Sequence, residues 1–440
     1  MNTQQGPQAR VPLNAIVVGN LEPADGLAGI GGIATALSLG RRGHNVTILE
    51  SAPKLMEVGA GIQVSPNMGK LLDRWGVSYR EKATLLEQID IRRWQDGSLL
   101  ACMPCNPAHG DQLTIHRADL HNALIDKALS LPNVKLLVNS HVVDVDFEKT
   151  EVVLADGTAI RGDVVLAADG IKSNIRPKLL EDNTMKIEAT GDAAYRIILS
   201  REEMLSHPLL KEMIDQSRAT RWIGPNRHIV AYPLRNHELF NVVLLHPDRG
   251  TVDDAWTIQG SKQDMIDDYA GWDNRITQII ANVQDDAIME WKLNLYPTLR
   301  TWVKKSVALL GDACHPMLPY IAQGAAQAVE DAGALGVILS SISSKQEIPA
   351  ALEAYQSSRK ARAEQVQQSG KMNRVSLHLP DGPEQQQRDE MFRLAMKGNS
   401  ESPDRWVDEK TRKVLWEHDA EEAALRTWKG TSNAVRGQER

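Results

Sequence analysis

The sequence contains few cysteines and no long apolar run. Three cysteines among 440 residues are a small and odd number, which argues against a disulfide framework and for a reducing compartment. No apolar run reaches the roughly 18 residues of a membrane-spanning helix. The start of the chain, Met1 to Gly6, is polar and lacks the hydrophobic core of a secretory signal. We therefore expect a cytoplasmic protein with no membrane span.

An excess of charge of one sign is also missing. The 50 Lys and Arg residues stand against 57 Asp and Glu, a net charge of −7 that is mixed along the chain. Because no basic stripe occurs, nucleic acid is not expected as a partner. The length of 440 residues and the apolar content of 42% predict two or three globular domains.

Residues with the spacing of a metal site are absent as well. Cys102 and Cys105 form one pair without a second pair elsewhere, so we expect no metal. A nucleophile made of Cys314 and His315 is disfavoured, because neighbouring side chains on an extended segment point apart.

What the sequence does contain is a strand, a glycine-rich helix start and a second strand. The strand over 15–19 ends in glycine, the helix covers 28–40, and the strand over 45–50 ends in an acid. This order is typical of a dinucleotide-binding unit, in which the glycines let a pyrophosphate approach the helix N-terminus and the acid binds ribose hydroxyls. The residues predicted to bind the cofactor here are Gly19, Gly29, Gly31, Gly32 and Glu50.

Eight residues, 20–27, interrupt this unit. Without these eight residues the sequence would contain a complete Gly-x-Gly-x-x-Gly fingerprint. The insertion can form a surface bulge, it can weaken cofactor binding, or it can be an artefact of the gene model. Since Glu22 and Asp25 would repel a pyrophosphate, a bulge that allows binding must point away from it.

Two later apolar strands end beside an aspartate. One precedes Asp169, and the other is followed by Gly311-Asp312, a proline-rich loop and a helix that starts at Gly324. An aspartate at such a place can bind a ribityl or ribose hydroxyl, and the free N–H groups of a helix start can face an electron-rich ring or a phosphate. The simpler interpretation is that Asp312 only caps the helix.

Residues 185–300 contain alternating stretches that predict an antiparallel sheet. His228 and Tyr232, four positions apart on one strand, share a face and can grip a phenol or a carboxylate, although ordinary strand residues are an equal interpretation. Arg196 lies within an apolar strand and either meets an anion or points to solvent. Arg117 starts a helix, a position that the helix dipole disfavours, so we expect it to bind an anion.

These stretches together resemble a known family. The glycine-rich unit, the strand end at Asp169, the turn at Asp312 and the helix start at Gly324 follow the order of the class A flavoprotein aromatic hydroxylases, which have the para-hydroxybenzoate hydroxylase fold. The segments 316–319 and 378–383 make the chain similar to the salicylate hydroxylase group in particular. The resemblance covers nearly the whole chain.

The resemblance implies an α/β fold with a GR2-type Rossmann-like FAD-binding domain, an inserted antiparallel β-sheet substrate domain and a helical C-terminal region. The predicted boundaries are 12–184 and 301–375 for the two parts of the FAD-binding domain, 185–300 for the substrate domain and 376–440 for the C-terminal extension. Residues 376–404 are polar and are expected to be rich in loops.

The resemblance also implies roles for single residues. Asp312 would bind the ribityl chain, and Asp169 would serve FAD and the pyridine nucleotide together. The full set implied for FAD is Gly19, Gly29, Gly31, Gly32, Glu50, Arg117, Asp169, Asp312, Gly324 and Ala325. The residues implied for the substrate are His228 and Tyr232 as the catalytic pair, with Arg196, Met317 and Pro319 as binding residues.

The implied activity is the hydroxylation of a phenolic aromatic substrate by FAD and dioxygen, with decarboxylation if the enzyme is salicylate-like. NADH or NADPH would be a transient co-substrate, since no second Gly-x-Gly-x-x-Gly motif follows a strand and no separate nucleotide-binding domain is expected. One alternative is a natural-product monooxygenase acting on a polyketide or an indole. Another is a variant whose insertion impairs FAD binding. A monomer or a homodimer is expected.

Overall fold

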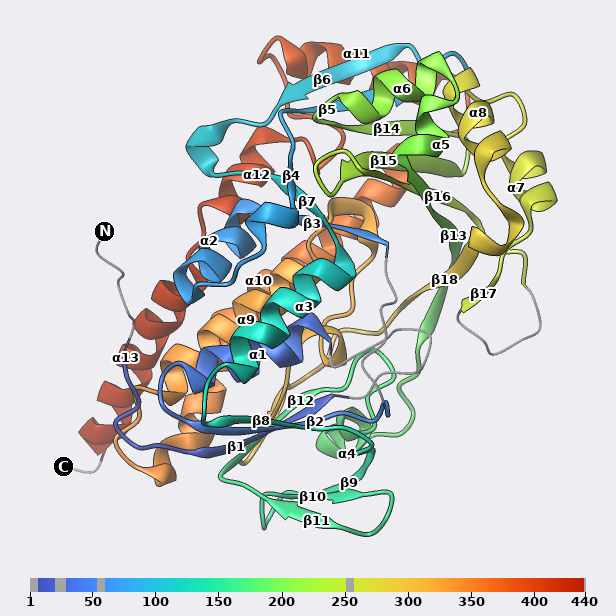
Figure 1. The fold of residues 1–440 in the computed structure, drawn as a ribbon. Helices are drawn as coiled ribbons and strands as arrows, with labels where there is room; N and C mark the ends of the chain where they lie inside the picture. Colours follow the sequence, from blue (N-terminus) through green and yellow to red (C-terminus); the bar gives the residue numbers. More distant parts are fainter. Residues whose placement is uncertain (1–6, 20–28, 54–59, 251–256, 439–440) are drawn as a thin grey trace.

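A computed structural model describes residues 7–19, 29–53, 60–250 and 257–438 of the chain. The insertion at residues 20–27 lies outside the described residues. Two large sheets, with helices packed around them, make up the described chain (Figure 1). This arrangement is the predicted α/β fold with a separate β-sheet region.

The first large sheet has six strands. Its order is β19 (Val303–Lys304), β20 (Val307–Leu309), β12 (Val164–Ala168), β1 (Asn14–Gly19), β2 (Asn45–Leu49) and β8 (Val134–Leu137). Only β19 runs antiparallel to its neighbour. Parallel strands covered on both faces read as continuous apolar runs, and Val17 and Val18 of β1 are accordingly buried.

Helices cover this sheet. They are α1 (Ile30–Gly40), α2 (Pro66–Trp75), α3 (Arg117–Leu129), α4 (Ile175–Leu180), α9 (Gly324–Leu339) and α10 (Ile348–Leu377). Helices α1 and α9 pack so closely that a Cβ added to Gly31 would lie 3.0 Å from the Cβ of Ala328. Residue 31 must therefore be glycine for the two helices to keep this distance.

The second large sheet has eight strands. Its order is β17 (Thr257–Gln259), β18 (Met289–Leu295), β13 (Glu188–Ser200), β16 (Leu239–Pro247), β15 (Arg227–Leu234), β14 (Arg218–Gly224), β5 (Gln88–Arg93) and β6 (Leu99–Pro104). All neighbours are antiparallel except β14 and β5. Strands β5 and β6 precede the predicted range of 185–300, so the sheet extends beyond that range.

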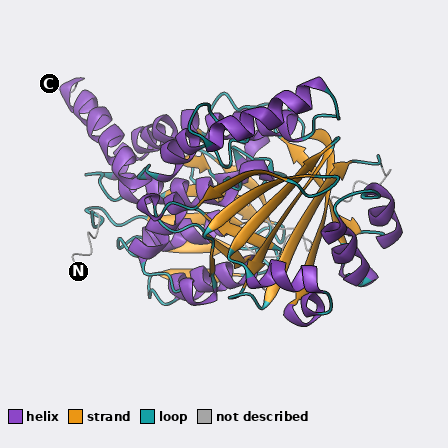
Figure 2. Cartoon of the chain, turned by 90° about the horizontal axis from the view of Figure 1, so that it is seen from above, coloured by secondary structure: helices purple, strands orange, loops and turns teal. Residues whose placement is uncertain are grey.

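Helices pack on both faces of this sheet (Figure 2). One face carries α5 (Arg201–Leu205), α6 (Pro208–Asp215), α7 (Lys262–Asp268) and α8 (Asn274–Asn282); the other meets α10, α11 (Pro383–Met396) and α12 (Glu409–Trp416). Side chains alternate along β15: Ile229 and Ala231 belong to the first core, whereas Val230 and Tyr232 belong to the second.

Two three-stranded sheets complete the fold. One joins β3 (Gly61–Val64), β7 (Leu113–His116) and β4 (Thr84–Leu85), and the other joins β9 (Val142–Asp146), β10 (Glu151–Leu154) and β11 (Ala159–Arg161). The second lies at the bottom of Figure 1.

The expectation of a loop-rich segment over 376–404 was wrong for its middle part. Helix α11 occupies Pro383–Met396. Its sequence looks polar because few of its residues face the core: Phe392 is fully buried, while Arg388 and Asp389 are buried as a salt-bridged pair at 2.8 Å. Phe392 packs in one core with Val366 and Trp406, residues outside this helix, and this packing, which the local pattern does not reveal, stabilises the helix.

The last helix, α13 (Ala420–Gln438), ties the C-terminal region to the first sheet's helices. Oε1 of Glu421 accepts hydrogen bonds from Arg42 at 2.7 Å and from the indole of Trp75 at 2.9 Å. Its Oε2 accepts one from Arg74 at 2.7 Å. A single buried carboxylate thus connects three residues around α1 and α2.

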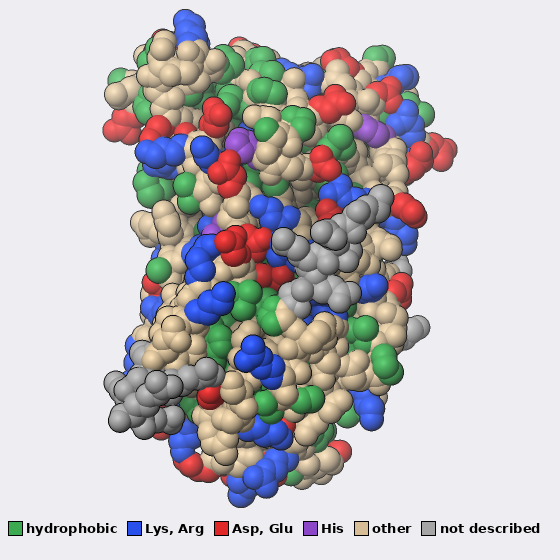
Figure 3. Space-filling model, turned by 90° about the vertical axis from the view of Figure 1, so that its left-hand side faces the viewer, with side chains coloured by type: hydrophobic (Ala, Val, Ile, Leu, Met, Phe, Trp, Pro, Cys, Tyr) green, Lys and Arg blue, Asp and Glu red, His purple; other side chains and the backbone are tan. Residues whose placement is uncertain are grey.

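None of the described helices is long and apolar enough to cross a membrane. On the face seen in Figure 3, acidic and basic side chains are interspersed, as the mixed charge pattern of the sequence predicts. Among the described residues on this face, neither sign of charge forms an extended area.

Candidate active site

A cavity of about 700 Å³ lies where the two large sheets meet. Elements from both halves of the chain line it: the start of α1, the end of β12, the turn after β20, the loop before α9, and strands β13 and β18. The predicted site residues on its wall are Gly29, Gly31, Gly32, Arg117, Asp169, Arg196, Asp312, Met317, Pro319, Gly324 and Ala325. The fold therefore brings together residues spread over almost 300 positions of the sequence.

The N-terminus of α1 opens into this cavity. A Cβ added at Gly29 would meet nothing within 4 Å, whereas one at Gly32 would lie 3.3 Å from the Cβ of Ala168. The backbone is thus open toward the cavity at the first glycine and closely packed behind it. Unpaired N–H groups and the helix dipole make such a start suitable for a pyrophosphate.

Asp169 lies at the end of β12 and faces the cavity. Its Oδ2 accepts hydrogen bonds from the backbone N–H groups of Asn174 at 2.9 Å and Ile175 at 3.2 Å. Its Oδ1 is buried and has no hydrogen-bond partner among the described residues. Burial raises the pKa of this carboxyl. A ligand hydroxyl entering the cavity would supply the missing partner.

The turn that carries Asp312 is held from behind by Asp331 of α9. Oδ2 of Asp331 accepts the N–H of Gly311 at 3.0 Å and Nε2 of His315 at 2.6 Å, and its Oδ1 accepts Nε of Arg359 at 2.8 Å. Gly311 has a φ of +58°, which suits glycine. Asp312 itself is exposed and lines the cavity, and the residue at the N-cap of α9 is Gln323, so Asp312 does not cap that helix.

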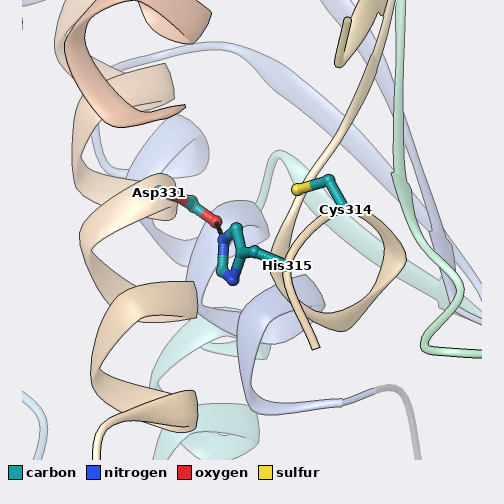
Figure 4. Close-up of side chains that lie close together, drawn as sticks. All are labelled: Cys314, His315 and Asp331. Carbon is teal, nitrogen blue, oxygen red and sulfur yellow. Dashed lines mark hydrogen bonds and ion pairs between the residues drawn. The ribbon is translucent and has the colours of Figure 1, made fainter. Parts of the chain in front are cut away.

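Cys314, His315 and Asp331 lie close enough together to resemble a metal site (Figure 4). Arg359 already supplies the positive charge that Asp331 needs, and Sγ of Cys314 donates to the carbonyl of Gly311 at 3.5 Å. Burial and the nearby Asp331 raise the pKa of the Cys314 thiol well above its usual range. A thiol that keeps its proton is a poor nucleophile.

Arg176 of α4 connects the two aspartate turns. Its guanidinium donates to the carbonyl of Ala313 at 3.1 Å and to that of Ile171 at 2.5 Å, and it lies 3.5 Å from the ring centroid of Tyr296. These contacts fix the distance between the turns at Asp169 and Asp312. The sequence analysis missed this role, although Arg176 follows Asp169 by only seven positions.

The opposite wall comes from the second sheet and from the loop before α9. Arg196 of β13 lies over the ring of Trp291 of β18, with 4.5 Å between the guanidinium carbon and the ring centroid. Met317 and Pro319 line the same cavity. The sequence alone does not show which way Arg196 points. In the structure Arg196 lines the cavity.

His228 and Tyr232 are not among the lining residues of this cavity. Nδ1 of His228 is hydrogen-bonded to Nε2 of His378 at 2.7 Å, and Tyr320 packs against the His228 ring with centroids 5.1 Å apart. Burial lowers the pKa of His228 and raises that of Tyr232. Since His378 lies 150 positions away, the sequence could not reveal that His228 is covered.

Gly19 and Glu50 also lie outside the lining. Gly19 ends β1 beside Ala168 of β12, and Glu50 is fully buried after β2, where its Oε1 accepts the N–H of Ala52 at 2.9 Å. Both stand at the carboxyl ends of the parallel strands, the edge at which ligands of such sheets bind. Their predicted contacts with a cofactor stay predictions.

The cavity suits FAD. It combines an open helix start for a pyrophosphate, an aspartate at each of two turns for hydroxyl groups, and the N-terminus of α9 at Gly324, where an added Cβ would meet nothing within 4 Å. Helix α9 is 16 residues long, so its dipole is well developed at this end. A flat, electron-rich ring can lie against this backbone.

Comparisons with known proteins agree with this geometry. A family model described as "FAD binding domain" matches residues 27–369. The FAD-dependent monooxygenase ntnJ of Nectria sp. is 41% identical over 394 residues, which cover 89% of this chain and 91% of the relative. The 3-hydroxybenzoate 6-hydroxylase of Polaromonas naphthalenivorans is 32% identical, covering 86% of this chain and 92% of its own.

Solved structures show the same fold. Salicylate hydroxylase in a substrate complex superposes with a TM-score of 0.76 at 24% identity, covering 96% of this chain and 98% of the other. CtdE in complex with FAD and a substrate superposes with a TM-score of 0.81 at 22% identity, covering 96% and 100%.

The fold and the cavity thus define a flavoprotein of the class with an FAD-binding domain and a β-sheet substrate region. The chain belongs to the FAD binding domain family, in the branch of the FAD-dependent monooxygenases. FAD is the cofactor of this family, as the resemblance predicted.

Proposed function

We propose that this FAD-dependent monooxygenase hydroxylates a phenolic aromatic substrate with electrons from NADH or NADPH. The balanced reaction consumes the aromatic compound, O₂, NAD(P)H and one proton, and yields the hydroxylated product, NAD(P)⁺ and water. Bound FAD supplies the two-electron chemistry that activates O₂. The observation that carries the proposal is the continuity of one cavity from the glycine-rich start of α1 to the Arg196 wall.

The chain's own residues divide into two groups along this cavity. The glycines of α1, Asp169 and Asp312 would bind the cofactor, and the N-terminus of α9 would face its ring. Arg196 would orient the substrate through an oxygen, while Met317 and Pro319 would pack on its ring and exclude water. Arg117 would bind an anionic part of the cofactor. The involvement of His228 and Tyr232 stays a prediction, which requires that His228 part from His378 or act through it.

A larger bicyclic or polyketide-derived ring is a second candidate substrate. The name of the ntnJ monooxygenase, which is 41% identical, specifies no substrate, whereas the 3-hydroxybenzoate 6-hydroxylase is only 32% identical. Incubation with monocyclic and bicyclic phenols, followed by mass spectrometry of the products, distinguishes the two. A gain of one oxygen atom without loss of CO₂ would argue against a salicylate-like reaction.

The visible spectrum of the purified protein tests the cofactor directly. We expect flavin absorption and substrate-stimulated oxidation of NADH or NADPH. A colourless protein that added FAD does not restore would contradict the proposal. Deleting residues 20–27 from such a protein would then show whether the insertion is responsible.

Location and assembly complete the proposal. Three cysteines, none of them in a disulfide, fit a reducing, cytoplasmic environment. A monomer or a homodimer is expected, and light scattering after size-exclusion chromatography measures which one forms.

A further inference from the structure

The starts of helices α2 and α9 are linked through their N-cap side chains. Ser65 is the N-cap of α2 and Gln323 is the N-cap of α9, but neither side chain caps its own helix. Instead, Nε2 of Gln323 donates to Oγ of Ser65 at 3.1 Å, and both side chains are buried. The chain lines the cavity on either side of this contact, at Ile62, three positions before Ser65, and at Gly324, directly after Gln323.

Asn67, which is also buried, closes this contact into a ring. Oγ of Ser65 donates to Oδ1 of Asn67 at 2.7 Å, and Nδ2 of Asn67 donates to Oε1 of Gln323 at 3.1 Å. Each of the three side chains therefore donates to the next one and accepts from the one before. Hydrogen bonds in this order polarise and strengthen one another. We refer to Ser65, Asn67 and Gln323 as the polar ring.

Glu330 of α9 fixes the direction of the polar ring. Its carboxylate is paired with Arg359 at 2.5 Å and with Arg362 at 2.7 Å, and its Oε1 lies 2.6 Å from Nδ2 of Asn67. Because an ionised carboxylate only accepts hydrogen bonds, the nitrogen of the Asn67 amide must face Glu330 and its oxygen must face Ser65. The ring thus has one orientation and is anchored to both α9 and α10.

The backbone N–H groups at the start of α9 are left free by this arrangement. The first hydrogen bond of the helix runs from the N–H of Gln327 to the carbonyl of Gln323 at 2.9 Å. The preceding N–H groups, those of Gly324, Ala325 and Ala326, have no acceptor within the described ranges. A Cβ added to Gly324 would meet nothing within 4 Å, so this turn is open to the cavity. Free N–H groups at a helix start favour negative charge in front of them.

We propose that the polar ring positions the start of α9 for the flavin. It keeps the Gln323 amide away from the free N–H groups and fixes this turn relative to β3. The ring thereby raises the midpoint potential of bound FAD, because reduced FAD carries more negative charge than oxidised FAD and gains more from the positive helix end. Its three members are positioning residues, since they do not line the cavity. The inference rests on the proposed function only for the placement of the flavin ring at the start of α9.

The variant Ser65→Ala tests the polar ring, because it removes the hydroxyl that both donates and accepts and leaves the size of the side chain almost unchanged. The midpoint potential of the FAD-loaded protein is measured by reduction in the presence of a reference dye, followed in the visible spectrum. We expect oxidised and reduced FAD to change their ratio of dissociation constants by about ten-fold. For a two-electron couple this lowers the potential by roughly 30 mV.

The matched control is Ser340→Ala, at the other end of α9. Ser340 is the C-cap of this helix, is fully buried, pairs with Nε2 of His44 at 3.0 Å and donates to the carbonyl of Gly336 at 2.6 Å. The control loses the same hydroxyl from a buried site, so its stability should fall as well. Its ratio of dissociation constants should stay within about two-fold of the wild type, or roughly 9 mV. If the potential of Ser65→Ala lies that close to the control, or above it, the proposal is overturned.

Two further measurements keep the proposal testable if Ser65→Ala does not fold. Gln323→Met, which removes the amide and keeps the length of the side chain, should lower the potential in the same way, and the same limits apply. In a crystal structure of the FAD-loaded wild type, we expect an acceptor atom of the flavin ring within about 3.2 Å of a backbone nitrogen of residues 324–326. A flavin ring bound elsewhere would contradict the inference. These measurements need neither substrate nor NAD(P)H, whereas product analysis tests the proposed function, so the two failures can be told apart.

Discussion

Two buried polar networks support opposite walls of the cavity, and they differ in charge. Behind the turn at Asp312, Asp331 and Glu330 are paired with Arg359, and all three are buried. Behind the loop at Pro319, His228 pairs with His378. The first network is held by opposite charges, and the second by a hydrogen bond between two imidazoles.

The pKa shifts of the two networks follow from this difference. Burial alone would raise the pKa values of Glu330 and Asp331. Arg359 and Arg362 beside Glu330, and His315 and Arg359 beside Asp331, outweigh burial and hold both pKa values below their usual range. Burial lowers the pKa of His378 to about 4 and that of His228 well below 6.5. The network behind the turn at Asp312 therefore keeps its charges over the ordinary pH range, whereas the network behind the loop at Pro319 depends on histidines that stay neutral.

The largest expected effect comes from removing the central charge of the first network. Arg359→Met should lower the free energy of unfolding by about 3–5 kcal/mol, because two buried carboxylates lose their main partner. FAD should be released as well, since Asp331 holds the turn at Asp312. Denaturant titration and flavin fluorescence measure the two effects. Arg393→Met, at an ion pair that is 55% exposed, is the control and should change stability by less than about 0.5 kcal/mol.

The hydrogen-bonded pair of His228 and His378 should stabilise the folded protein less at acid pH. The unfolded chain binds a proton at residue 378 near pH 6.5, whereas the folded chain does so only near pH 4. The stability from this group is therefore complete above pH 6.5 and is lost as the pH falls toward 4. Between pH 7 and 4.5, the wild type should lose about 2 kcal/mol more than His378→Gln, which does not titrate. Parallel denaturation curves over this range would contradict the prediction. His44 and His418, whose pKa values burial also lowers to about 4, titrate in both proteins and cancel.

A smaller effect is expected at Tyr320, which packs against His228 and also contacts Asp192. The hydroxyl of Tyr320 donates to Asp192 at 2.5 Å, and Arg374 also donates to this buried carboxylate. Tyr320→Phe should cost about 1–2 kcal/mol of unfolding free energy, because Asp192 keeps only its arginine partner. The ring is retained, so the packing against His228 should persist. A decrease in the free energy of unfolding as large as that of Arg359→Met would mean that the two networks depend equally on charge.

The smallest effect concerns Ala322, which lies in the chain between Pro319 and the start of α9. Ala322 has a φ of +52°, in the left-handed region that glycine tolerates better. Ala322→Gly should therefore stabilise the enzyme by about 0.5–1 kcal/mol, measured by thermal unfolding. Ala361→Gly, an exposed position inside α10, should destabilise it by about 1 kcal/mol. Destabilisation by both changes would show that the loop gains nothing from glycine.

The parts of the fold with strong local signals could be predicted from the sequence. The start of α9 at Gly324 and the strand before Gly311 were placed correctly, because glycine, proline and apolar runs act within a few residues. The last helices were also expected. Arg196 was selected because a charge within an apolar strand is unusual, and it does line the cavity.

The features that depend on distant pairs could not be predicted. The parallel contact of β14 with β5 joins residues more than 100 positions apart, and no local pattern indicates it. The same holds for the hydrogen bond between His378 and His228 and for the hydrogen bond that Arg359 donates to Asp331. Trp291 looks like an ordinary strand residue until the register places it beside Arg196. Side-chain partners of this kind arise from tertiary packing, which overrides local preference.

The separation of the cavity's parts along the chain has a consequence for biosynthesis. Strand β12 ends at Ala168, but its partner β20 begins only at Val307. At translation rates of about 5–20 residues per second, the ribosome needs roughly 7–28 s to synthesise the segment between them. During this interval the nascent chain carries an unpaired, apolar strand edge that invites chaperone binding. Cofactor loading is consequently a late event, which waits for the turn at Asp312 and the helix behind it to leave the exit tunnel.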